Sequence, residues 1–214
     1  MKTEKIKMSE EMLDCLRAAV KDYQTEKRYR HTLAVEREAQ SLARIFLPDD
    51  ENRLRAAALL HDITKILDTE KQLKICAEFD IIVRSEDIAA PKLFHAKTGA
   101  FVAKRDFAGY TDADIVSAVY YHTTGRAGMS IFEMLIYLAD YIEDTRTFED
   151  CVTLRKMFYE GVELARNMEE KLEVLRKTMI RSFDMTVKCL IDEGALVDRD
   201  TIEARNWFIL NKIF

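Results

Sequence analysis

The sequence of 214 residues has little proline and glycine, two and six residues respectively. Sheets and their tight turns use both residue types, so this shortage favours helices joined by short loops. The sequence has no run of roughly 18 apolar residues, the length that a membrane-spanning helix needs. Its charged N-terminal stretch MKTEKIKMSEEML lacks the apolar segment of a signal peptide. We therefore expect a cytoplasmic protein without a membrane partner.

Closely spaced cysteines and an excess of positive charge are also missing. The four cysteines are scattered and form no CxxC motif, which is typical of free thiols in a reducing compartment. The 33 Lys and Arg residues face 38 Asp and Glu residues. Binding along nucleic acid needs clustered cationic charge, so no nucleic-acid partner is expected. A local cationic pocket for a small anion is compatible with this composition.

Hydrophobic residues recur with helical spacing along most of the chain. They predict helices at 9–20, 27–46, 54–65, 71–79, 94–107, 112–121 and 130–141, and a long helix over 154–190 that can break near Gly161. Residues 81–91 are expected to form an irregular connection, and Asp200 to cap a last short helix near 201–207. We predict one all-α domain, with a helical core of about 27–150 and a C-terminal helical tail over 151–214.

Four histidines and two aspartates lie at the ends or on the faces of the predicted core helices: His31, His61, Asp62, His95, His122 and Asp140. A buried carboxylate is unfavourable unless it is paired, and a divalent cation would supply the missing charge. Adjacent residues on a helix point about 100° apart, so His61 and Asp62 reach one ion most easily near a helix end. Taken singly, each histidine is more often a packing or surface residue than a ligand, and Asp140 could pair with an arginine or lysine.

The order of these six residues resembles that in the HD-domain phosphohydrolases. The branch that it resembles in detail is the symmetrical bis(5'-nucleosyl)-tetraphosphatases. The similar segments span Lys27 to Asn206 and are KRYRHTLAV, AALLHDITK, FHAKTGAFVA, YYHTTGRAGMSIFEMLIYLADYIEDTR and TIEARN. The resemblance implies an HD-domain helical bundle whose C-terminal helices complete a nucleotide site. It implies hydrolysis of diadenosine tetraphosphate to two ADP by attack of metal-bound water on phosphorus.

The same resemblance implies a metal site and its ligands. Iron is the implied metal, as one or two ions, with manganese or magnesium as alternatives, and its ligands are His31, His61, Asp62 and Asp140. His95 and His122 either complete a second metal site that Asp62 bridges or donate hydrogen bonds to phosphate, because histidine suits both tasks. The residues implied to be catalytic are Asp62, Lys65, His95 and His122.

Positions near the expected ligands suggest contacts to the substrate. Lys65 follows Asp62 by three residues and Arg28 precedes His31 by three, so each pair shares a helix face; the alternative is that they face solvent. The glycines of residues 123–129 could offer backbone N–H groups to phosphate, or form a plain connection. With the resemblance added, the expected substrate-binding set is Arg28, Asp62, Lys65, His95, His122, Gly128, Met129, Arg146, Thr201, Ile202, Glu203, Ala204, Arg205 and Asn206.

The sequence departs from the resembled family at two places, and it is also compatible with two other functions. Asp144 stands where the resembled family has proline, and the middle of HDITK differs from its tyrosine-alanine pair. The expected metal ligands do not distinguish a dinucleoside tetraphosphate from a deoxynucleoside monophosphate or a guanosine polyphosphate as the substrate. A nucleotide sensor without turnover is the third reading. The long C-terminal amphipathic helix also allows a homodimer.

Overall fold

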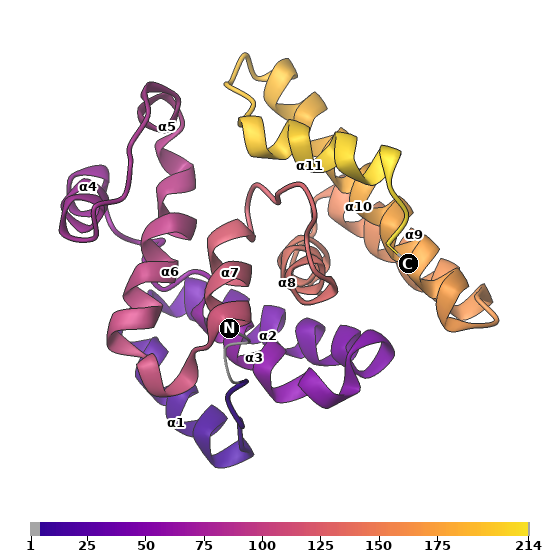
Figure 1. Ribbon diagram of the computed structural model, residues 1–214, viewed down its shortest axis with the longest axis horizontal. Coiled ribbons are helices and arrows are strands. Elements are labelled where there is room, and N and C mark those ends of the chain that lie inside the picture. The colour runs from indigo at the N-terminus through magenta and orange to yellow at the C-terminus, as the bar shows by residue number, and fades with distance from the viewer. Residues whose placement is uncertain (1–4, 214) are drawn as a thin grey trace.

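The computed structural model describes residues 5–213, and all regular secondary structure within that range is helical (Figure 1). The prediction of an all-α protein is therefore confirmed. The α-helices are α1 (Glu10–Lys21), α2 (Glu26–Phe46), α3 (Glu51–Leu60), α4 (Thr69–Glu78), α5 (Ser85–Ala89), α6 (Phe94–Asp106), α7 (Ala113–Tyr121), α8 (Ile131–Ile142), α9 (Glu149–Leu164), α10 (Met168–Asp192) and α11 (Arg199–Leu210). Short 3-10 turns occupy Pro48–Asp50, Pro91–Leu93 and Ala108–Tyr110.

Side-chain caps explain where many of these helices begin. The side chains of Ser9, Thr25 and Asp68 each accept a hydrogen bond from a backbone N–H in the first turn of α1, α2 and α4. Ser130 and Glu133 form a capping box at the start of α8. Each cap satisfies an N–H group that has no partner within the helix.

Three predicted boundaries are corrected by the structure. The helix predicted at 54–65 is α3, which begins at Glu51 and ends at Leu60, so His61 onwards follow as hydrogen-bonded turns. The segment expected to be irregular, 81–91, contains the short helix α5. Asp198 caps α11 in place of Asp200, and α11 continues past Trp207 to Leu210.

The long C-terminal helix is broken, but not near Gly161. The chain leaves α9 at Ala165 and enters α10 after Asn167, whose side chain caps it. Gly161 lies inside α9, where an added Cβ would stand 2.9 Å from Cγ1 of Val174 on α10. Its role is therefore close approach of two helices, which a sequence pattern does not reveal.

The core is built around α3 and α8, both of which are buried along nearly their whole length. Helix α3 packs against α1, α2, α7 and α8. Two buried arginines of α3 are paired, Arg53 with Asp112 at 2.8 Å and Arg55 with Glu36 at 3.1 Å.

Figure 1 shows α9, α10 and α11 grouped together on one side of α8, away from α4 and α5. No helix within the described range has the length and apolar character to cross a lipid bilayer.

The loop after α7 is fitted against the C-terminal helices at Gly125. This residue has a left-handed φ of +64°, and an added Cβ would stand 2.7 Å from Cζ of the fully buried Phe183 on α10. Gly194 has the same φ of +64° but nothing within 4 Å of the added Cβ.

We predict that Gly125→Ala lowers the free energy of unfolding by about 2–5 kcal/mol, through backbone strain and overpacking. Gly194→Ala should lower it by only about 1–2 kcal/mol, because only the backbone is strained. Urea unfolding of both variants measures the difference. Equal losses would contradict the proposed role of the Phe183 contact.

Candidate metal centre

The His61-Asp62 pair reaches the centre of the bundle because α3 ends just before it. Turns closed by Ile63 N–H to Leu60 O and Lys65 N–H to Asp62 O carry the chain away from the helix axis. His61 and Asp62 therefore lie just beyond the end of a helix, the position from which we expected both side chains to reach one ion. The two side chains are buried, so their polar atoms depend on each other and on neighbouring helices.

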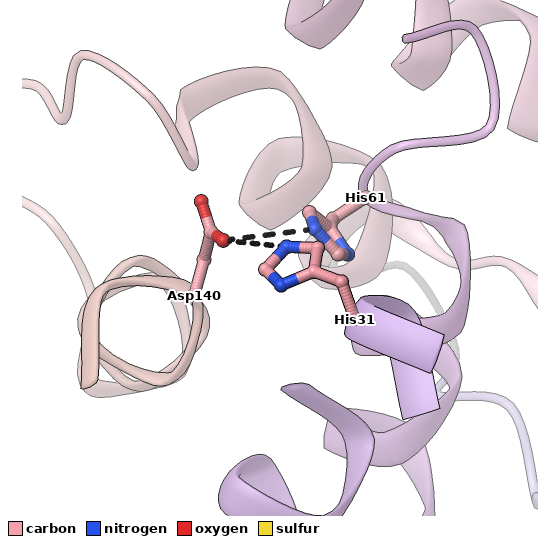
Figure 2. A group of neighbouring side chains, drawn as sticks. All are labelled: His31, His61 and Asp140. Atoms are coloured by element: carbon pink, nitrogen blue, oxygen red, sulfur yellow. Dashed lines mark ion pairs between the residues drawn. The ribbon is translucent and has the colours of Figure 1, made fainter. Parts of the chain in front are cut away.

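One group of ligand atoms joins α2, the turn after α3, and α8. Asp140 Oδ1 lies 3.0 Å from His31 Nε2 and 3.9 Å from His61 Nε2 (Figure 2). Asp62 Oδ2 completes this side, at 3.9 Å from His31 Nε2 and 3.4 Å from His61 Nε2. Atoms of His31, His61 and Asp140 all lie within 4.8 Å of one another, a spacing at which one metal ion can bind all three.

The other oxygen of Asp62 faces a second pair of histidines. Asp62 Oδ1 lies 3.2 Å from His95 Nε2, at the start of α6, and 3.6 Å from His122 Nε2, at the end of α7. The two Nε2 atoms of this pair are 3.1 Å apart. His61, Asp62 and His122 form a second set of atoms within 4.8 Å, to which His95 does not belong. Asp62 thus stands between two groups of imidazoles.

The hydrogen bonds at Nδ1 orient all four rings. Nδ1 of His61 donates to the Ala58 carbonyl at 2.6 Å, and Nδ1 of His122 donates to the Val119 carbonyl at 2.7 Å. Nδ1 of His95 donates to the Lys92 carbonyl at 2.6 Å, and Nδ1 of His31 contacts the Glu143 carboxylate at 3.1 Å. A carbonyl only accepts, so each Nδ1 carries a hydrogen, and in the neutral ring Nε2 is left with a lone pair. The Nε2 atom of His61 is buried without a hydrogen-bond partner, whereas that of His31 faces Asp140 Oδ1 at 3.0 Å. Lone pairs and carboxylate oxygens that converge in this way suit a divalent metal ion.

The carboxylates remain charged despite burial. Burial would raise the pKa of Asp62, but the charge of His61 and the facing imidazoles of His122 and His95 hold it well below its usual range. Burial would also raise the pKa of Asp140, and it too lies well below its usual range because of Arg146 and His31. Both side chains are therefore available as anionic ligands at neutral pH.

Two histidines differ in protonation. Burial would lower the pKa of His31, yet hydrogen bonds with Asp140 and Glu143 raise it to about 9. Burial lowers the pKa of His95 to about 4, although Asp62 opposes this shift. In the metal-free protein at pH 7, His31 is therefore charged and His95 is neutral.

Three cationic residues expected to bind phosphate surround the cluster. Arg28 Nη1 donates to Asp62 Oδ2 at 2.8 Å, and Lys65 Nζ lies 3.1 Å from His95 Nε2. Arg146 donates both to the carboxylate and to the backbone carbonyl of Asp140. The structure thus brings Arg28 and Lys65 to the centre, as their spacing in the sequence suggested, and Arg146, as the family resemblance implied.

Two residues that sequence reasoning missed support the centre from α8 and α9. The fully buried carboxylate of Glu143 accepts from His31 Nδ1 at 3.1 Å and from the Thr145 hydroxyl at 2.8 Å. Arg155 donates to the carbonyls of Ile142, Glu143 and Arg146. The separation of three residues between Asp140 and Glu143 was a signal that could have found Glu143, since it places both on one helix face.

A buried polar network missed from the sequence holds the backbone of His95. Thr64 Oγ1 donates to the His95 carbonyl at 2.9 Å, and Gln72 donates to the Thr64 carbonyl at 2.7 Å. Thr98, one turn into α6, donates to Gln72 Oε1. All three side chains are buried, so the network fixes the start of α6 relative to the turn after α3.

The remaining residues expected to bind substrate lie outside the cluster. Met129 is buried beside Gly125, whereas Gly128 has a left-handed φ of +69° and an added Cβ there would meet only the end of the Arg126 side chain, at 4.0 Å. Ile202, Arg205 and Asn206 line a groove between α10 and α11, where Arg205 pairs with Asp184 at 2.5 Å. The rest of the TIEARN segment divides by exposure into buried Thr201 and Ala204 and exposed Glu203. A substrate role for these residues stays a prediction.

Comparison with known proteins agrees with this geometry. The family model of the HD domain matches residues 28–145, a range that contains all six candidate ligands and Glu143. The chain belongs to the HD domain family. Arg146 and the helices α9, α10 and α11 lie beyond the part matched as HD domain.

Relatives with assigned names extend the match over nearly the whole chain. The symmetrical bis(5'-nucleosyl)-tetraphosphatase of Bacillus subtilis is 36% identical, over 90% of this chain and 95% of its own. That of Halalkalibacterium halodurans is 32% identical, over 90% and 95%. A crystal structure from Clostridium acetobutylicum, described as a "predicted HD superfamily hydrolase involved in NAD metabolism", is 36% identical with a TM-score of 0.80 and covers 95% of this chain and 99% of that one.

We predict that metal binding at pH 7 releases one proton, because the ion must displace the proton on Nε2 of His31. Since the pKa of His31 is raised from 6.5 to about 9, its proton is held at pH 7 and lost as the pH rises through that value. Apparent affinity for Mn²⁺ should therefore rise about tenfold per pH unit from 7 towards 9. Calorimetry in buffers of different ionisation enthalpy counts the proton. Binding without proton release and independent of pH would contradict the assignment.

We also predict that Glu143→Gln weakens metal binding by about 10- to 100-fold, the usual effect of losing a carboxylate that orients a ligand histidine. The matched control is Asp144→Asn, because Asp144 is an exposed neighbour whose carboxylate, among residues 5–213, pairs only with the exposed Arg37. Titration with Mn²⁺ compares the two variants. A loss of affinity that is equal in both would show that general charge, rather than the His31 hydrogen bond, is responsible.

Proposed function

We propose that this HD-domain protein is a metal-dependent hydrolase that cleaves dinucleoside tetraphosphates symmetrically, with diadenosine tetraphosphate giving two ADP. The observation that carries the proposal is the largely buried cluster of four histidines and two aspartates with Arg28, Lys65 and Arg146 around it. Its relatives carry the name symmetrical bis(5'-nucleosyl)-tetraphosphatase over nearly their full length. Such a centre suits attack on a polyphosphate, which needs charge neutralisation and an activated water.

The residues that would hold the metal are His31, His61, Asp62 and Asp140. When bound, a divalent ion supplies charge neutralisation of phosphate oxygens and lowers the pKa of a water molecule. An imidazole-rich set with two carboxylates is typical of sites for iron and other transition metals. We therefore propose iron as the metal, with manganese or magnesium as alternatives.

The remaining catalytic work falls to side chains of the chain itself. Arg28, Lys65 and Arg146 would bind phosphoryl oxygens and hold the charge that develops on the leaving diphosphate. His95 donates from Nδ1 to the Lys92 carbonyl, so its neutral ring has only a lone pair at Nε2. His95 would therefore accept a proton or bind a second ion more readily than donate a hydrogen bond to phosphate. His122 has the same orientation through Val119.

The C-terminal helices would complete the nucleotide site, making the chain one functional domain. A cavity of about 500 Å³ beside the centre is lined by His122 and Asp140 on one side and by Met185 and Leu190 of α10 on the other. A cytoplasmic location, a homodimer and the lack of a nucleic-acid partner stay predictions. So does the substrate role of residues 201–206.

Hydrolysis of another nucleotide is the second candidate, because the similar structure from Clostridium acetobutylicum is described as involved in NAD metabolism. The cluster would act on any accessible phosphoanhydride or phosphoester, so the choice between substrates rests on the cavities around it. Identification of products from diadenosine tetraphosphate separates the two candidates. ADP alone supports symmetrical cleavage, whereas AMP with ATP would contradict it.

We predict that Asp62→Ala lowers the rate of this hydrolysis by more than about a hundredfold and reduces the metal content, because both sides of the centre lose their shared carboxylate. Asp14→Ala, at an exposed position of α1, should change neither quantity. Metal analysis and a stopped ADP assay on anaerobically purified protein measure both effects. Full activity of Asp62→Ala would overturn the site assignment.

A further inference from the structure

We infer that the cavity between the start of α2 and the α8–α9 loop binds the nucleoside diphosphate half that leaves, with Phe148 stacking on its base. The inference rests on the proposed function and names where the second half of a two-nucleoside substrate lies. This cavity measures about 670 Å³, within the range of about 300–1,000 Å³ that is usual for small-molecule sites. It opens beside His31, one of the candidate metal ligands.

The charge of this cavity suits a polyphosphate. Five cationic residues line it, and they are Lys27, Arg28, Arg30, Lys65 and Arg146. Its one acidic lining residue is Glu143, whose carboxylate is already bound by His31 and Thr145. Arg30 is paired with Glu26 at 3.1 Å on the exposed surface, while Lys27 has no ion pair with any residue that the structure describes. A diphosphate would therefore meet cations from the mouth of the cavity to the metal centre.

The cavity on the other side of the centre has the opposite character. It measures about 500 Å³, and Asp140, Asp150 and Glu193 place carboxylates along its wall. Arg146 is its one arginine or lysine, and Tyr141 contributes an aromatic ring. Such a cavity accepts a nucleoside more readily than a free diphosphate, because carboxylates repel phosphate. A substrate with two nucleosides joined by four phosphates needs a place on each side of the centre, and the two cavities provide them.

Phe148 lies where the two cavities meet. It lines both of them together with Arg146, and 72% of its surface is exposed. It occupies the N-cap position of α9 but makes no side-chain cap hydrogen bond there. A large aromatic side chain left in water at the rim of a cationic cavity is typical of a platform for base stacking.

We assign the leaving half to the cationic cavity because of the charge that cleavage places on it. Water adds to one inner phosphorus, and the bond from that phosphorus to the central bridging oxygen breaks. The electron pair of that bond stays on the bridging oxygen, which becomes the terminal phosphate oxygen of the leaving ADP, and the water gives up its protons to solvent. Lys65 and Arg146, at the inner end of the cationic cavity, would stabilise the charge that appears there.

The first test counts ADP molecules and measures kinetics with the metal-loaded enzyme. Calorimetry should find two ADP bound per chain in the wild type and one in Lys27→Glu/Arg30→Glu. The same double variant should raise KM for diadenosine tetraphosphate by about tenfold or more, because two attractive charges become repulsive, while its metal content stays unchanged. The matched control is Lys156→Glu/Lys177→Glu, a charge change on the exposed surface of α9 and α10. Two ADP bound and an unchanged KM in the first double variant would overturn the inference.

The second test addresses Phe148. Phe148→Ala should raise KM for diadenosine tetraphosphate by about tenfold, the effect of losing one base stack, and Phe148→Trp should restore it. Leu164→Ala, at the other end of α9 and 80% exposed, is the matched control and should leave KM unchanged. An unchanged KM in Phe148→Ala would refute the stacking role. Failure of the wild type to hydrolyse the substrate would refute the proposed function alone, since ADP counting tests the cavity separately.

Discussion

Keeping two carboxylates charged inside an apolar bundle is the constraint on which this structure depends. Asp62 and Asp140 lie where water cannot solvate them freely, so each needs positive charge and hydrogen bonds from the protein. Imidazoles on one side and the guanidinium groups of Arg28 and Arg146 on the other meet that need. The four histidines lie on or directly after four different helices and Asp140 lies on α8, so the packing of α2, α3, α6, α7 and α8 is tied to the centre.

Asp62 contributes most to this constraint, because its two carboxylate oxygens contact different pairs of histidines. One oxygen faces His31 and His61, and the other faces His95 and His122. A shift of either histidine pair would therefore also move the Asp62 carboxylate that the other pair contacts. The end of α3 at Leu60 makes this arrangement possible, since a continued helix would direct Asp62 to only one side.

The sequence predicted the cluster because charged and imidazole side chains on apolar helices stand out from their surroundings. Glu143 was missed because it sits in an acidic pair with Asp144, and a pattern of residues does not tell which of the two is buried. The prediction of a break near Gly161 was wrong for a related reason: this glycine allows close packing against Val174 on another helix. Helix existence follows from local periodicity, whereas close approach and burial depend on tertiary packing. The cavities on either side of the centre could not be predicted, since they arise where several distant segments fail to fill space.

The guanidinium of Arg155 binds three carbonyl groups that lie within five consecutive residues, from Ile142 to Arg146. One planar group of fixed size thus sets the spacing of the backbone directly after α8. A change in the length of this connection would therefore be accommodated beyond Arg146, towards Phe148, and not between the two ends that the guanidinium holds. The part of the loop towards Phe148 lies outside this constraint, while the part that holds Glu143 against His31 is kept at constant length.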